Sequence, residues 1–232
     1  MKENSTTAKY IRYVIAVILF ITMIACMVIT ILTENDLFKG IASGCYVLFA
    51  LFNLIQARRR PARYPMLIMI ALILAIIGDL TLRMNFPLGA GSFALCHVLY
   101  IVAYHLVDGF RIRELIYTAF FGAGCICVFT LLPWVHIGSP LMWTVCIAYS
   151  VIVSFMAGKA ISNAQSRKDR ASILTAIASC MFWLSDVFVL LATFSTLDRM
   201  TMRSIDLGLY YPAQFILAYT IYLFFASKDE KQ

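Results

Sequence analysis

Long apolar runs separated by short polar connections make up almost the whole chain. Runs of about 18–25 apolar residues are long enough to cross a bilayer as helices. They predict eight transmembrane helices, over residues 11–32, 37–56, 64–84, 91–108, 113–132, 140–160, 170–194 and 205–226. The pattern therefore predicts an all-α, polytopic membrane helix bundle in which residues 1–232 form one domain.

The composition agrees with a membrane protein. Hydrophobic residues make up 62% of the chain and charged residues 13%, whereas about a quarter of an ordinary soluble domain is charged. Because no soluble domain remains outside the predicted helices, we expect binding or chemistry within the bundle or at its mouth.

Lysine and arginine residues sort to one side of the predicted topology. With a cytoplasmic N-terminus, all but four of the 19 lie on the cytoplasmic side, and the external ones are Lys39, Arg83, Arg199 and Arg203. Cytoplasmic connections of membrane proteins are enriched in these residues. The distribution predicts two cytoplasmic termini and a bacterial inner (plasma) membrane, and it accounts for the net charge of +7 without a nucleic-acid partner.

Two acidic residues fall deep inside apolar segments. Of the 12 Asp and Glu residues, the pattern places Asp79 and Asp186 alone at such depth. A charged side chain there costs about 2.5–3.5 kcal/mol on insertion scales, and such groups usually face a bundle interior or a wet cavity. Two neighbouring carboxyl groups repel each other when both are ionised, which favours one acid and one carboxylate. A packing role, with each carboxyl bonded to a neighbouring hydroxyl or carbonyl, is the alternative.

The two aspartates belong to similar sequence units. Gly78-Asp79 precedes the block Phe93-Ala94-Leu95-Cys96-His97-Val98-Leu99-Tyr100, and Ser185-Asp186 precedes the block Leu209-Tyr210-Tyr211-Pro212-Ala213-Gln214. Four predicted helices separate the copies, which favours two parallel four-helix repeats. At a rise of about 1.5 Å per residue, six polar residues then lie at a similar depth in the outer half of the bundle: Asp79, Asp186, His97, Tyr100, Tyr211 and Gln214.

The last four of these residues are candidates for orienting the carboxyl groups, a water or a substrate, although His97 alone is as typical of helix packing. A metal ion bound by Asp79, Asp186 and His97 is an alternative, but catalytic zinc sites usually have three protein ligands at spacings such as HxxH, which are missing. We therefore expect no metal or cofactor. Arg83, one turn after Asp79, can pair with that carboxylate, bind a lipid phosphate or simply extend into the interface.

The polar blocks around Asp79, His97, Asp186 and Tyr211 resemble those of the YhhN family, which includes lysoplasmalogenases. The resemblance covers nearly the whole chain and departs at Lys39-Gly40, where the family is expected to favour Lys-Pro. It implies a membrane hydrolase that cleaves the vinyl ether of a lysoplasmalogen into a fatty aldehyde and a glycerophospho-base, with Asp79 and Asp186 as catalytic residues.

Vinyl ether hydrolysis begins with protonation of carbon and passes through an oxocarbenium-like cation, so it needs an acid and a nearby anion. Two carboxyl groups serve these roles in glycoside cleavage. We expect Asp79 and Asp186 to share them, in an order that the sequence leaves open, with the phosphate near Arg83. The partners expected are lysophospholipid and membrane lipid, without an obligatory protein partner. Another lysophospholipid or ether lipid, a lipid transporter and a non-catalytic lipid-binding protein are the alternatives.

Overall fold

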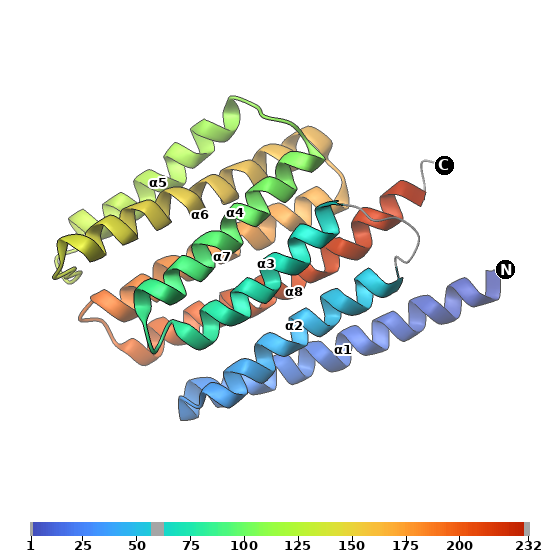
Figure 1. Ribbon diagram of the computed structural model, residues 1–232, viewed down its shortest axis with the longest axis horizontal. Coiled ribbons are helices and arrows are strands. Elements are labelled where there is room, and N and C mark those ends of the chain that lie inside the picture. Colours follow the sequence, from blue (N-terminus) through green and yellow to red (C-terminus); the bar gives the residue numbers. More distant parts are fainter. Residues whose placement is uncertain (1, 57–62, 230–232) are drawn as a thin grey trace.

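The computed structural model describes residues 2–56 and 63–229. In these residues the chain forms eight helices, α1 (Lys2–Thr33), α2 (Asp36–Gln56), α3 (Arg63–Thr81), α4 (Phe86–Val107), α5 (Arg113–Leu131), α6 (Pro140–Arg167), α7 (Arg170–Phe194) and α8 (Arg199–Asp229). Each described helix is long and apolar enough to cross a membrane. They lie side by side, and α1 begins at the same end of the bundle where α8 ends (Figure 1). The all-α bundle predicted from the sequence is confirmed.

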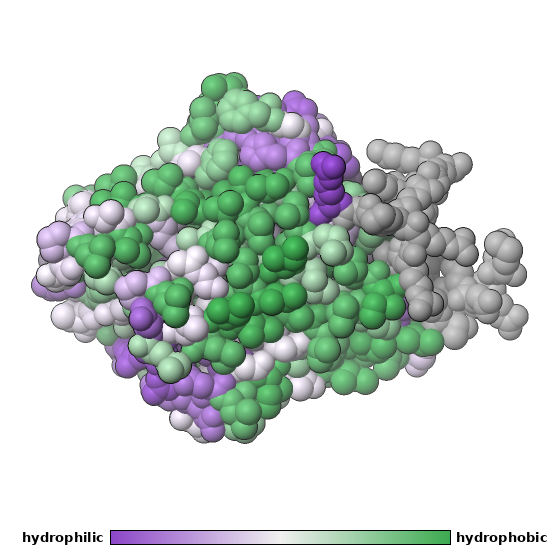
Figure 2. Space-filling view, in the orientation of Figure 1, coloured by the Kyte–Doolittle hydropathy of each residue, from purple (hydrophilic) through white to green (hydrophobic). Residues whose placement is uncertain are grey.

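The outer surface of the bundle is apolar over its middle. In Figure 2, hydrophobic residues cover the centre of the face, and hydrophilic residues gather toward its two ends. Helices α1 and α5 are the least covered by protein, with large exposed side chains such as Ile21 and Phe120. Apolar surfaces of this kind pack favourably against lipid chains, as expected of an integral membrane protein.

Helix pairs repeat between the two halves of the chain. The contacts of α1 with α2, α2 with α3 and α3 with α4 recur as α5 with α6, α6 with α7 and α7 with α8. Between the halves, α2 packs on α8 and α6 packs on α4. Exchanging each helix with the one four positions later reproduces these pairs, as a two-fold axis along the membrane normal requires. The symmetry is approximate, because α8 contacts α1 and α3 more extensively than its counterpart α4 contacts α5 and α7.

Two glycines allow close backbone approach. A Cβ atom on Gly158 of α6 would lie 2.8 Å from the backbone nitrogen of Thr118 on α5. A Cβ atom on Gly89 would lie 2.4 Å from the Cα atom of Leu82, where the chain turns from α3 into α4. Small residues are favoured at membrane helix contacts because dispersion forces, rather than exclusion of water, hold such helices together.

Helices α1, α4 and α8 begin several residues earlier than predicted, and α1 begins at Lys2 instead of residue 11. Helix α4 begins at Phe86 instead of residue 91, and the Asn85 side chain accepts a hydrogen bond from the backbone N–H of Leu88. Helix α8 begins at Arg199 instead of residue 205, and Asp198 accepts one from the backbone N–H of Thr201. These side chains cap helix starts that the apolar periodicity does not reveal. The earlier start adds Arg199 and Arg203 to α8.

A buried ion pair lies at the end of the bundle that is predicted to be cytoplasmic. Lys159 of α6 and Glu114 of α5 are fully buried, with 2.5 Å between Nζ and Oε1. Lys159 also donates to the backbone carbonyls of Asp108 and Gly109, so it holds the α4–α5 connection. Glu114 is therefore a further buried carboxyl group, which lies near a helix end rather than deep in an apolar segment and is enclosed by tertiary contacts.

Candidate active site

Asp79 lies on α3, two residues before the helix ends, and is held by groups from two other helices. Its Oδ2 atom accepts hydrogen bonds from Ser43 of α2, at 2.6 Å, and from Tyr210 of α8, at 2.8 Å. The Lys39 Nζ atom lies 3.3 Å from Oδ1 and donates to the backbone carbonyl of Asp79 at 2.7 Å. Because Asp79 is only 3% exposed, this ion pair and its hydrogen bonds compensate for the lost hydration.

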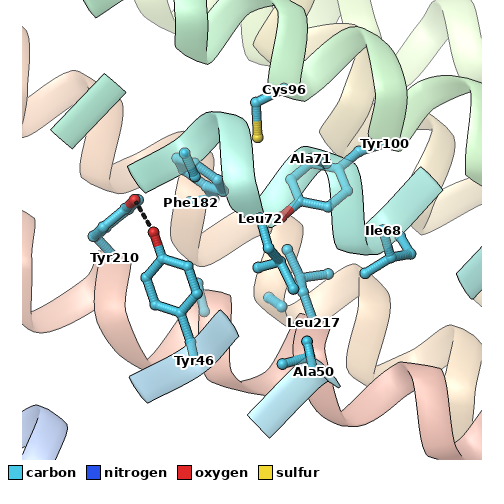
Figure 3. Close-up of a cluster of buried hydrophobic side chains, with 14 of the residues drawn as sticks. Tyr46, Ala50, Ile68, Ala71, Leu72, Cys96, Tyr100, Phe182, Tyr210 and Leu217 are labelled. Atoms are coloured by element: carbon cyan, nitrogen blue, oxygen red, sulfur yellow. Dashed lines mark hydrogen bonds between the residues drawn. The ribbon is translucent and has the colours of Figure 1, made fainter. Parts of the chain in front are cut away.

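Two tyrosines complete this half of the site. The Tyr46 and Tyr210 hydroxyl oxygens are 3.1 Å apart (Figure 3), and the Tyr46 hydroxyl also donates to Asp79 Oδ2 at 3.4 Å. Tyr211 donates to the backbone carbonyl of Lys39 at 3.2 Å, so it positions the lysine rather than the carboxylate. The Asp79 side chain is therefore fixed from several directions.

Asp186 on α7 has a different environment. Its Oδ2 atom lies 3.3 Å from His97 Nε2, which in turn lies 2.9 Å from the Tyr149 hydroxyl. The other ring nitrogen of His97 faces the Met156 sulfur at 3.2 Å. The contact with His97 is close but not aligned as a hydrogen bond, and none of the described residues gives Oδ2 one. Asp186 is therefore less restrained than Asp79.

The two half-sites follow the approximate two-fold symmetry. Asp79 of α3 meets side chains from α2 and α8, whereas Asp186 of α7 meets His97 of α4, with Tyr149 of α6 beside it. Phe182 lies between the halves, with ring centroids 4.6 Å from His97 and 5.2 Å from Tyr210. The same framework thus presents two carboxyl groups with unlike partners.

Both carboxyl groups line one cavity of about 70 Å³, here called the inner cavity. A cavity of this size holds a few water molecules. Its apolar walls come from α4, α5, α6 and α7 and include Phe86, Phe93, Phe129, Val145 and Leu190. A water and the reacting end of an apolar chain are the ligands that suit these walls.

A wider cavity of about 400 Å³, here called the vestibule, adjoins the inner cavity on the side that the sequence predicts to be external. Its lining includes all the basic residues that the sequence places outside, which are Lys39, Arg83, Arg199 and Arg203. Six residues line both spaces and form a neck between them, namely Lys39, Leu82, Phe86, Val189, Asp206 and Leu207. Positive charge is thus gathered at the entrance to the two carboxyl groups.

Arg83 does not pair with Asp79, so that sequence-based alternative is wrong. Its guanidinium group donates to the backbone carbonyl of Glu34 at 2.6 Å and lies 3.2 Å from the Glu34 carboxylate. Arg203 approaches the other carboxylate oxygen of Glu34 at 3.4 Å. Arg83 lies in the turn after α3 and reaches the α1–α2 connection, where Glu34 lies. Arg199, also in the vestibule, forms no ion pair with any described residue.

Asp206 is a third carboxyl group at this site, and the sequence analysis missed it. It is 9% exposed, lies on α8 and accepts a hydrogen bond from Ser185 Oγ on α7 at 2.6 Å. The last predicted helix begins at residue 205, so Asp206 lies at its edge and does not stand out as a deep carboxyl group. Asp206 lies four residues before Tyr210, and this spacing places both on one face of a helix. Polar residues at that spacing are the sequence pattern that indicates Asp206.

Tyr100 and Gln214, which were also expected at the site, lie outside it. Tyr100 donates to Gln214 at 2.9 Å, and both are fully buried among core side chains outside the lining of either cavity (Figure 3 shows Tyr100). The site instead uses residues that the sequence did not single out, and these are Ser43, Tyr46, Tyr149 and Tyr210. Ser43 and Tyr46 follow Lys39 at helical spacing, so a polar face on the second predicted helix indicates them.

Among the described residues, no three His, Cys, Asp or Glu side chains come together as a metal site. With the geometry in place, comparison with known proteins identifies the family, because its model matches residues 35–221. The chain belongs to the YhhN family. The YhhN match runs from the start of α2 into α8 and contains every residue of the two half-sites. No match was found among curated proteins or among solved structures.

Proposed function

We propose that the protein is an intramembrane hydrolase that cleaves the vinyl ether bond of lysoplasmalogens. The products are a fatty aldehyde and glycerophosphocholine or glycerophosphoethanolamine. Membership of the YhhN family supports a membrane hydrolase. The observation that carries the proposal is that Asp79 and Asp186 line one small cavity with unlike partners.

The partners of the two carboxyl groups favour one order of roles. Asp79 is paired with Lys39 and accepts hydrogen bonds from hydroxyl groups, so it serves as the anion that stabilises positive charge. Asp186 lies beside His97 without an aligned donor, so it serves as the acid. This division resembles that of glycoside hydrolysis, where one carboxyl donates a proton and the other stabilises an oxocarbenium-like cation.

The reaction then runs in three steps. Asp186 transfers its proton to the vinyl carbon farther from oxygen, and the double-bond electrons form the new C–H bond. Water adds to the resulting oxocarbenium carbon and returns a proton to the Asp186 carboxylate. The hemiacetal then breaks its carbon–oxygen bond to glycerol while its hydroxyl proton moves, through water, to the leaving oxygen, giving aldehyde and alcohol. His97 and Tyr149 orient Asp186 during the proton transfers.

The vestibule suits the phosphate of the substrate. Arg83, Arg199 and Arg203 line it, and guanidinium groups bind phosphate through paired charged hydrogen bonds. In this placement the alkenyl chain follows the apolar walls of the inner cavity, while the head group stays at the outer interface. Other lysophospholipids share the phosphate but lack the vinyl ether, so they bind as competitors.

Fatty-aldehyde release by purified protein in detergent tests the proposal. Asp186→Asn and Asp79→Asn are each expected to lower kcat at least about 100-fold, the lower limit typical of acid–base groups. Asp108→Asn, which removes a carboxylate near the opposite end of the bundle, serves as the matched control and keeps activity. A chelator is expected to leave turnover unchanged.

Size-exclusion profiles and thermal unfolding show whether each variant is folded. Full activity in a folded Asp79→Asn or Asp186→Asn variant removes that residue from the mechanism. Folded wild-type protein that binds lysoplasmalogen without cleaving it contradicts the hydrolase and favours lipid binding or transport.

A further inference from the structure

The neck between the vestibule and the inner cavity contains two polar side chains of opposite charge. Of its six residues, Leu82, Phe86, Val189 and Leu207 are apolar. The other two, Lys39 and Asp206, are 8% and 9% exposed. A substrate that reaches Asp79 and Asp186 from the vestibule passes the lining to which both belong.

Lys39 and Asp206 do not pair with each other in the part of the chain that the structure describes. The Lys39 ammonium group bonds to the Asp79 carbonyl and lies near its carboxylate, which leaves one of its three N–H donors for another partner. Asp206 receives the Ser185 hydroxyl on Oδ1. Its Oδ2 atom receives no hydrogen bond from the described residues, and Asp206 lines both cavities.

The neck thus offers a donor, the Lys39 ammonium group, and an acceptor, the Asp206 carboxylate, which are not paired with each other. Together they suit one small group that both donates and accepts a hydrogen bond. An alcohol hydroxyl has this character, since it offers one O–H donor and two lone pairs. An ester carbonyl or an ether oxygen only accepts, so it would leave the free Asp206 oxygen unpaired. Leaving a buried polar group without a partner is unfavourable, because its lost hydration is not replaced.

We propose that Lys39 and Asp206 bind the glycerol C2 hydroxyl of the substrate and thereby select lysolipids over their acylated parents. The inference rests on the proposed function. With the phosphate in the vestibule and the vinyl ether beside Asp79 and Asp186, the glycerol carbons between these groups lie in the neck. The C2 hydroxyl donates to Asp206 Oδ2 and accepts from the free N–H of Lys39. An acyl group at C2 removes the donor and does not fit the passage.

The test compares two alkenyl glycerophosphocholines that differ only at glycerol C2, one with the hydroxyl and one with hydrogen. Wild-type protein is expected to prefer the hydroxyl compound by at least about 100-fold in kcat/KM, because sites built around a substrate hydroxyl reject analogues that lack it. Asp206→Leu is expected to reduce this ratio to below about 5-fold, mainly by lowering kcat/KM for the hydroxyl compound. Asp108→Asn, near the other end of the bundle, is expected to keep the wild-type ratio.

The ratio is the deciding measurement because partial misfolding lowers turnover of both compounds equally. If Asp206→Leu does not fold, Asp206→Asn takes its place, with an intermediate ratio expected. A ratio near one in the wild type, or an unchanged ratio in a folded Asp206 variant, overturns the proposal.

A binding measurement separates this inference from the reaction itself. Saturated 1-O-alkyl glycerophosphocholines with and without the C2 hydroxyl cannot undergo vinyl ether hydrolysis, and titration calorimetry in detergent gives their Kd values. Tighter wild-type binding of the hydroxyl compound, lost in Asp206→Leu, supports the neck site even if no vinyl ether is cleaved. Equal Kd values for the two compounds contradict it, whatever the activity.

Discussion

At the scale of single residues, Lys39 connects the parts of the site. It pairs with Asp79, receives the Tyr211 hydroxyl on its backbone carbonyl and lines both the inner cavity and the vestibule. The sequence placed it only among the four basic residues on the external side. Its burial changes that interpretation, because a lysine enclosed by protein needs a carboxylate partner.

Lys39→Met is expected to destabilise the protein. Removing one member of a buried ion pair leaves the other uncompensated, which costs about 3–5 kcal/mol in soluble proteins. Replacing both, as Lys39→Met with Asp79→Leu, is expected to recover most of the lost stability because no unpaired charge remains. Thermal unfolding in detergent measures both effects.

Aldehyde release provides the control for this pair of variants. The double variant is expected to remain inactive even where its melting temperature recovers, since the stabilising anion is gone. A single Lys39→Met variant as stable as the wild type would show that the ion pair contributes nothing to the fold.

At the scale of helices, the close contact between α5 and α6 depends on a missing side chain. Gly158→Ala is expected to lower stability by about 1–3 kcal/mol, the usual cost of overpacking, because the new Cβ atom meets the backbone of Thr118 at 2.8 Å. Gly91→Ala on α4 is the matched control, with nothing within 4 Å of its Cβ position. It is expected to be neutral or slightly stabilising, since alanine favours helix. Equal melting temperatures for the two variants would contradict the close packing.

The start of α8 shows how the extent of a helix decides which residues meet the site. Because the helix begins at Arg199, Arg203 joins Asp206 on α8, about one turn before it, and both line the vestibule. Tyr210 follows Asp206 by four residues and reaches Asp79. One face of α8 therefore supplies a cation, a carboxyl and a hydroxyl at successive depths.

At the scale of the whole molecule, an approximate two-fold arrangement carries unlike chemistry in its two halves. Equivalent helices bring Lys39, Ser43 and Tyr210 to Asp79 but His97 to Asp186. Equal surroundings would give the two carboxyl groups equal tendencies to hold a proton. A reaction that uses one acid and one anion requires two carboxyl groups with unlike partners.

The orientation of the bundle is testable with introduced cysteines. Gly138 in the α5–α6 connection is expected to face outside and Gly109 in the α4–α5 connection to face the cytoplasm, because all but four of the 19 Lys and Arg residues lie on the cytoplasmic side of the predicted topology. Both positions have open space for a side chain. A membrane-impermeant maleimide is expected to label Gly138→Cys in intact cells and Gly109→Cys only after permeabilisation. The reverse labelling pattern would show that the topology is opposite to the predicted one. Wild-type protein measures the background labelling of the native cysteines.

The sequence by itself determined the architecture, because a span of the hydrocarbon core requires a long apolar run whatever its neighbours are. It also identified Asp79, Asp186 and His97, because polar groups at bilayer depth stand out against apolar surroundings. The span boundaries at α4 and α8 were not accessible in this way, since caps such as Asn85 and Asp198 lie in polar stretches without periodicity.

Only the tertiary structure decided which polar groups meet. Lys39 and Asp79 are 40 positions apart, and Tyr210 is 131 positions from Asp79, so their contacts depend on how the helices pack and rotate. Tyr100 and Gln214 share the depth of the carboxyl groups, yet they face each other in the core. Depth follows from counting residues along one helix, whereas direction follows from packing against several, and that is why the sequence indicated the level of the site but not its full membership.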